Sequence, residues 1–324
     1  ALRDEGFDSR WYKFELIEAP FMRIGIDLGG TKIEAVVLNS NGDVICCRRL
    51  PTPKNNYQRT LSDIVALVHQ VEADCSIIGQ RIAVGLAAPG TISSETGSMK
   101  NCNSTCLNGQ FLYEDLQRQL DRPVRLANDA DCLALSEAND GAAMNCFSTF
   151  GVILGTGVGG AVVINKQLLQ GPNGITGEWG HNPMPAMSFG WAASGQSRRC
   201  YCGRNDCVEA WLSGPGLEQS YYDLTGQQLP AEQIAAKGAA GDLLAAHLLD
   251  QYSEALAAAL AVVINVLDPD AVVLGGGLSN IEALYQQVPQ YWQQYVFTDR
   301  CKTQLLAAKY GDSSGVRGAA WLWA

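Results

Sequence analysis

The pattern of apolar and polar residues predicts strands alternating with helices along most of the chain. Short apolar runs predict strands over residues 22–28, 33–38, 44–50, 82–88 and 124–127. Apolar residues at helical spacing predict helices over residues 57–73, 111–120 and 129–139. The first three strands follow one another without a helix, so we expect the chain to open with a hairpin meander.

A second strand–glycine–strand unit begins halfway along the chain, with strands predicted over residues 149–154 and 158–164. After it the pattern predicts a long helix over 243–267, a buried strand over 271–274 and a closing helix over 315–323. The order βββαβα therefore occurs in each half. This order predicts an α/β protein, and 324 residues are enough for two lobes.

Composition and charge exclude several classes of protein. A net charge of −10 argues against a nucleic-acid partner, because phosphate contacts need clustered Lys and Arg. No apolar run reaches the roughly 18 residues of a membrane span. Residues 1–21 carry charges throughout and lack a hydrophobic signal core, so we interpret them as an extension outside the fold and expect a cytoplasmic protein. The cysteines outside the cluster described next are then reduced thiols.

One segment combines a potential metal site with two carboxylates. His181, Cys200, Cys202 and Cys207 form a set of one imidazole and three thiolates, which suits a closed tetrahedral zinc site with a structural role. Glu178 and Glu209 bracket these ligands, so a zinc ion would also hold the two carboxylates near each other. The alternative is a set of ordinary thiols and a core histidine.

Three glycine clusters each follow a predicted strand. Glycine lets the backbone approach a phosphate and point N–H groups at it, so three such turns favour a nucleotide site. The pattern is neither a Walker loop nor a dinucleotide fingerprint. The clusters are Gly29-Gly30-Thr31, Gly155-Thr156-Gly157 and Gly275-Gly276-Gly277.

Polar residues beside these turns have two interpretations each. Asp27 could hold Mg²⁺ through water, and Lys32 could face a phosphate or be a solvated surface lysine. Asp129 follows Asn128 at the end of a strand, where it could cap a helix or act as a general base.

Several of these motifs, in this order, resemble those of the ROK family (repressors, uncharacterised reading frames and sugar kinases). The resemblance covers residue 22 to the C-terminus. It is carried by D-L-G-G-T-K, A-N-D-A, L-G-T-G-V-G-G, G-E-W-G-H with C-Y-C-G-R-N-D-C-V-E, and D-P-D-A-V-V-L-G-G-G. The family usually has glycine where this chain has Asp206; aspartate tolerates a left-handed backbone, so we expect the metal loop to survive with slightly weaker metal binding.

The resemblance implies a two-lobed actin-like ATPase (ribonuclease H-like) fold with a zinc-binding insertion at 178–209. Residues 22–127, joined by the C-terminal helix 312–324, would form one lobe, and residues 128–311 the other. It also implies ATP, Mg²⁺ and structural Zn²⁺ as cofactors, and a homodimer. Asp129 would be the catalytic base, and the sugar would contact Gly90, Asn103, Asn128, Glu178, His181 and Glu209.

Within the family, the sequence resembles bacterial fructokinases most. The stretches that carry this are K-N-C-N-S-T-C-L-N-G-Q, G-E-W-G-H-N-P and the ending G-D-S-S-G-V-R-G-A-A-W-L-W. This implies phosphorylation of D-fructose to fructose 6-phosphate. The alternatives are a kinase for mannose, glucose, N-acetylglucosamine or allose, or a non-catalytic sugar sensor. The 21 residues before Met22 are too few for the helix-turn-helix domain of a ROK repressor.

Overall fold

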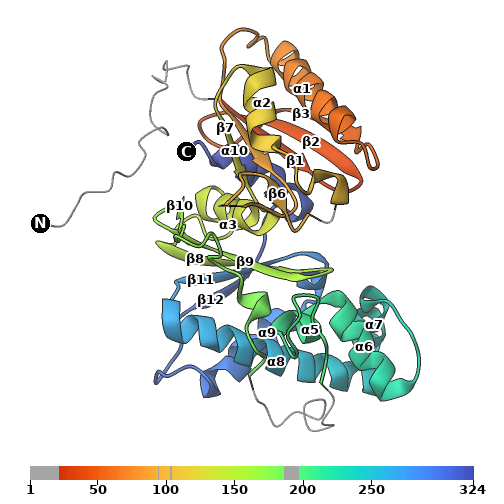
Figure 1. Ribbon diagram of the computed structural model, residues 1–324. Coiled ribbons are helices and arrows are strands. Elements are labelled where there is room, and N and C mark those ends of the chain that lie inside the picture. Colours follow the sequence, from red (N-terminus) through yellow and green to blue (C-terminus); the bar gives the residue numbers. More distant parts are fainter. Residues whose placement is uncertain (1–21, 94, 103, 186–196) are drawn as a thin grey trace, which may run out of the picture.

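The computed structural model describes residues 22–93, 95–102, 104–185 and 197–324, and the predicted extension 1–21 lies outside them. Two five-stranded mixed sheets form the framework (Figure 1). The first has the order β3 (Val44–Pro51), β2 (Lys32–Leu38), β1 (Arg23–Leu28), β4 (Val84–Ala87) and β7 (Val124–Ala127). The second has the order β10 (Gln167–Leu168), β9 (Val158–Ile164), β8 (Ser148–Leu154), β11 (Ala271–Gly275) and β12 (Gln304–Ala307).

The two sheets share one topology, which confirms the predicted repeat. In each, an antiparallel meander of three strands leads into two parallel strands: β1 pairs with β4 and β4 with β7, as β8 pairs with β11 and β11 with β12. Parallel neighbours need a helical crossover between them, so the helices follow the same order in both halves. A two-stranded ribbon, β5 (Thr91–Ile92) with β6 (Met99–Lys100), extends the first half.

The helices fall into three groups. On the first half lie α1 (Tyr57–Asp74) and α2 (Leu112–Leu120). Beneath the second sheet lie α5 (Val208–Leu212), α6 (Gly214–Thr225), α7 (Ala231–Ala239), α8 (Leu243–Leu267) and α9 (Ala283–Tyr291) (Figure 1). Between the sheets lie α3 (Asp129–Asn139), which packs on β8 and β9, and α10 (Ser314–Trp321), which packs on β1 and β4.

Glycine makes the layer between the sheets thin enough for α3 and α10 to touch. A Cβ on Gly85 of β4 would overlap the backbone of Ala319, and one on Gly318 of α10 would overlap the backbone of Cys132 in α3. These contacts bring the helices and the first sheet to close packing distance, so the N-terminus of α3 is fixed between the two halves.

Candidate functional site

Asp129 stands at the first position of α3, and Asn128 rather than Asp129 caps this helix. The Asn128 side chain accepts a hydrogen bond from the backbone N–H of Asp131 at 2.7 Å. The interpretation of Asp129 as the N-cap is therefore wrong, and its carboxylate accepts the adjacent N–H of Ala130 at 2.9 Å.

The environment of Asp129 is typical of a group that takes up protons. The side chain is accessible to solvent, yet much of the surrounding volume is protein. This burial raises the pKa of its carboxyl, against the opposing effect of the backbone hydrogen bond. Burial, then the charges of Asp129 and Glu178, also raise the pKa of Asp131 to about 6.

Asp27, at the end of β1 in the first sheet, lies near Asp129 and Asp131. Burial, and then the charges of Asp131, Asp27 and Asp129, raise the pKa of the Cys132 thiol, so all three carboxylates lie around this one buried group. Gly315 at the start of α10 leaves room for the Asp27 carboxylate, which lies 3.1 Å from where a Cβ would stand. The end of β1 and the start of α3 thus bring acidic groups together.

Lys32 does not point toward these carboxylates. Its Nζ pairs with Glu34 Oε2 at 3.1 Å, and Arg49 pairs with the other oxygen of Glu34 at 2.8 Å. Glu34 is buried; burial opposes its ionisation, but hydrogen bonds from Arg49, Lys32 and Cys47 outweigh this and lower its pKa. In this structure Lys32 is therefore paired with Glu34, and its contact with a phosphate stays a prediction.

The second and third glycine clusters pack against each other. Gly276 has φ +82°, and a Cβ there would meet the backbone of Leu154 just before Gly155. Gly155, Thr156 and Gly277 line a cavity of about 990 Å³ whose opposite wall is the alanine-rich face of α7. Gly29, Gly30 and Thr31 line neither this cavity nor the one described next.

A second cavity, of about 620 Å³, joins this turn to the predicted metal loop. Thr156 and Pro215 line both cavities, and Cys200, Tyr201 and Glu209 line the second. Glu209 is fixed at the turn, since its Oε2 accepts the N–H of Val158 at 3.0 Å. A Cβ on Gly157 would lie 2.6 Å from this oxygen. The predicted sugar-side and phosphate-side groups therefore meet at Thr156 and Glu209.

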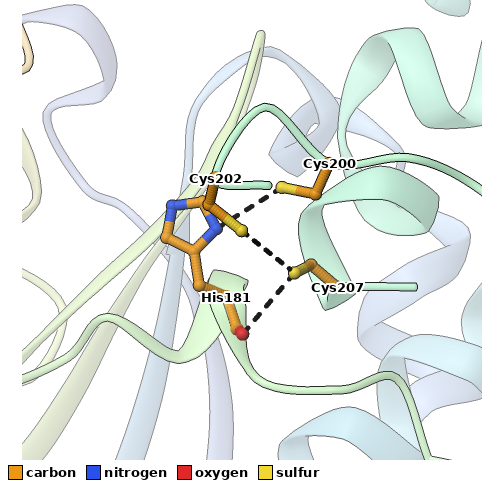
Figure 2. A group of neighbouring side chains, drawn as sticks. All are labelled: His181, Cys200, Cys202 and Cys207. Atoms are coloured by element: carbon orange, nitrogen blue, oxygen red, sulfur yellow. Dashed lines mark hydrogen bonds between the residues drawn. The ribbon is translucent and has the colours of Figure 1, made fainter. Parts of the chain in front are cut away.

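The four predicted metal ligands converge (Figure 2). Their ligand atoms all lie within 4.8 Å of one another. His181 Nδ1 lies 3.6 Å from Cys200 Sγ, and Cys202 Sγ lies 3.5 Å from Cys207 Sγ. Ligands about 2.0–2.3 Å from a tetrahedral zinc ion are separated by roughly 3.5–3.8 Å. The cluster could thus hold a zinc ion with little rearrangement.

The loop that carries these cysteines depends on two residues with positive φ. Gly203 has φ +89° and Asp206 has φ +55°. Asp206 thus adopts the left-handed backbone expected of it, and its carboxylate accepts hydrogen bonds from Ser197 Oγ and the Arg198 N–H, both at 2.8 Å. The aspartate therefore stabilises the loop in place of the family's glycine.

The thiols differ in their readiness to ionise. Hydrogen bonds from Arg204 lower the pKa of Cys202 to about 6, whereas burial raises the pKa of Cys207 to about 12. Since zinc binds thiolates, Cys202 is the ligand already prepared for a metal. A metal would have to deprotonate Cys207 and also Cys200, whose pKa burial raises.

The other predicted sugar contacts in question are Glu178, Gly90 and Asn103. Glu178 is exposed beside the short 3₁₀ turn Trp179–His181, and its charge acts on both Asp131 and Tyr201. Gly90 has φ +85° and packs against Cys102, which explains the glycine structurally. Asn103 lies outside the described residues.

Sequence reasoning missed two features of the site. Tyr201 sits between two metal ligands, and its hydroxyl lies 3.0 Å from His181 Nε2, the nitrogen expected to face a sugar. Only its place inside the Cys-x-Cys motif could have drawn attention to it. The cavity wall on α7 was missed because no strand or motif marks it.

Comparisons with known proteins agree with this geometry. The ROK family model matches residues 23–324. N-acetyl-D-glucosamine kinase of Yersinia enterocolitica is 38% identical over 302 residues, which are 93% of this chain and 99% of that protein. The corresponding kinase of Aliivibrio fischeri is 37% identical over 304 residues, again 93% and 99% of the two chains.

Among solved structures, the ROK hexokinase of Thermus thermophilus has a TM-score of 0.81 and 29% identity, over 93% of this chain and 97% of that one. The ROK glucokinase of Streptomyces griseus, in complex with glucose and AMPPNP, has a TM-score of 0.71 and 25% identity, over 93% and 98%. The expected two-lobed fold of the actin-like ATPase type is confirmed.

The expectation of a fructokinase is wrong. Relatives that match nearly end to end are named N-acetyl-D-glucosamine kinases, whereas three short stretches, over residues 100–110, 177–183 and 311–323, suggest the fructose enzymes. The last of these stretches builds α10, which packs on β1 and β4, so its match reflects packing and carries little information about the sugar. Matched over residues 23–324, the chain belongs to the ROK family.

Proposed function

We propose that the protein is an ATP-dependent sugar kinase that phosphorylates the 6-hydroxyl of N-acetyl-D-glucosamine. The observation that carries this proposal is the 37–38% identity, over 93% of the chain, to relatives named N-acetyl-D-glucosamine kinase. The Streptomyces griseus relative that holds glucose and AMPPNP supports the broader assignment to sugar and ATP.

In this proposal Asp129 is the general base. Its raised pKa favours proton uptake, and its position on a helix held between the halves gives it a fixed place. It would accept the proton of the sugar 6-hydroxyl as that oxygen attacks the γ-phosphorus of ATP. Asn128, Glu178, His181 and Glu209, with Gly90 and Asn103, would contact the other parts of the sugar.

ATP would occupy the cavity of about 990 Å³. Its apolar wall on α7 suits an adenine, and the backbone N–H groups at Thr156 and Gly277 suit phosphates. Asp27 would hold Mg²⁺ through water. The ion supplies charge neutralisation during phosphoryl transfer, so catalysis depends mainly on positioning by the chain.

The metal loop would hold the sugar-contacting residues His181 and Glu209 in place. A zinc ion on His181, Cys200, Cys202 and Cys207 would fix the loop that ends at Glu209.

We keep the division into lobes 22–127 with 312–324 and 128–311, the homodimer and the cytoplasmic location as predictions. Among the described helices, none has the length and apolar character needed to cross a bilayer.

The test is an ADP-release assay with ATP and Mg²⁺ across N-acetylglucosamine, glucose, mannose, allose and fructose. We expect the highest kcat/KM for N-acetylglucosamine. A site that binds the acetamido group rejects sugars lacking it, because its polar partners are then left unpaired. A higher kcat/KM for any of the other four sugars would contradict the proposed substrate.

A further inference from the structure

The nitrogen of His181 that faces away from the metal cluster already has a hydrogen-bond partner in this structure. His181 Nδ1 points to Cys200, and Nε2 lies 3.0 Å from the Tyr201 hydroxyl. The two rings meet edge to face, with centroids 5.1 Å apart and an interplanar angle of 78°. The tyrosine therefore occupies the position at which a sugar hydroxyl would meet His181.

The hydrogen-bond roles follow from the ligand set. If Nδ1 binds a metal, the neutral imidazole carries its proton on Nε2, so Nε2–H donates and the phenol oxygen accepts. The phenol proton is then free to point toward an acceptor.

With Nδ1 on the metal, the Tyr201 hydroxyl accepts from the imidazole at the place where a bound sugar hydroxyl would accept. Tyr201 is 79% exposed, so little packing resists its rotation away from His181. It also lines the cavity of about 620 Å³ together with Glu209 and Thr156.

We propose that Tyr201 is a displaceable cap on the sugar site, whose hydroxyl holds His181 Nε2 until a substrate hydroxyl replaces it. This rests on the proposed sugar contact of His181. The cap keeps the imidazole oriented in the empty enzyme, and it competes with the sugar. Tyr201 is then a residue that sets sugar affinity without taking part in phosphoryl transfer.

Tyr201→Phe tests this, because it removes only the competing oxygen. We expect the dissociation constant for N-acetylglucosamine without ATP, measured calorimetrically, to fall about three- to tenfold, the range for one exposed hydrogen bond. The kcat and the zinc content should not change. The control is Tyr222→Phe, which removes the phenol oxygen of another exposed tyrosine, on α6 and 45% exposed, and should leave the affinity unchanged.

A second measurement does not depend on catalysis. Sugar binding to the wild type should change the near-ultraviolet absorption of tyrosine, and the change should be absent in Tyr201→Phe. Weaker or unchanged sugar binding in Tyr201→Phe would overturn the cap, as would an unchanged tyrosine spectrum in the wild type. If another sugar binds best, the proposed substrate fails, and the same titrations with that sugar still decide the role of Tyr201.

Discussion

At the residue scale, the proposed proton transfer depends on Asp129 and on its position at the N-terminus of α3. Asn128 takes the capping role, so the aspartate carboxylate remains available at the helix N-terminus. From the sequence motif alone, Asp129 could be either a helix cap or a general base, because both roles need an acidic residue at this position. Only the geometry of the cap separates the two.

Asp129→Asn should lower kcat about 10²- to 10⁴-fold, the usual contribution of a positioned base. The amide cannot accept the proton, but it has nearly the same shape, so sugar affinity should stay within about twofold. Steady-state kinetics and calorimetric sugar binding measure the two effects. A variant with near-normal kcat would remove Asp129 from the mechanism.

The same carboxyl predicts the pH dependence. Asp129 must be ionised to accept a proton, and its pKa is raised, so kcat/KM should begin to fall with decreasing pH above the range of an ordinary aspartate. A pH profile measures this. In Asp131→Asn the loss of a neighbouring negative charge should move the fall to lower pH without abolishing it. A profile that became flat in this variant would assign the titration to Asp131 instead.

At the element scale, strongly capped helices were predicted at their observed ends, and short edge elements were not. The predictions 129–139 and 243–267 coincide with α3 and α8, whose caps Asn128 and Asp242 are visible in the sequence. The strand β12 was missed because its four residues are half-exposed at a sheet edge and show no alternation. The cavity on α7 depends on contacts between distant segments, which no local pattern encodes.

The metal loop gives a prediction at this scale. Cys202→Ser should lose bound zinc and raise the KM for sugar by at least about tenfold, because Glu209 and His181 lose their support. Metal analysis and kinetics on one preparation measure both. Cys301→Ser, outside the cluster, is the control and should keep zinc and KM. Full sugar affinity in a zinc-free Cys202→Ser protein would show that the loop needs no metal.

At the scale of the whole molecule, one carboxylate joins the two connections between the halves. Glu137 of α3 is fully buried and accepts hydrogen bonds from Ala142 N at 2.8 Å, Lys309 N at 2.9 Å and Ser314 Oγ at 2.9 Å. Ala142 lies between α3 and β8, and Lys309 lies between β12 and α10. In the sequence Glu137 looks like an ordinary helix residue, so this role was not predicted.

Glu137→Gln places an amide N–H₂ among donors and should lower the free energy of unfolding by about 1–3 kcal/mol. Urea denaturation measures this. Glu95→Gln at an exposed loop position should cost less than about 0.5 kcal/mol. If the two variants were equally stable, Glu137 would not be the group that holds the halves together.

The sugar preference of the enzyme is decided by the products formed from an equimolar mixture of N-acetylglucosamine, glucose, mannose and fructose with limiting ATP and Mg²⁺. Because the sugars compete for one enzyme, the product ratio gives the ratio of kcat/KM values. We predict that N-acetylglucosamine 6-phosphate dominates the phosphorus NMR spectrum. A mixture dominated by the phosphate of any other sugar, or by N-acetylglucosamine phosphorylated at another hydroxyl, would contradict the account.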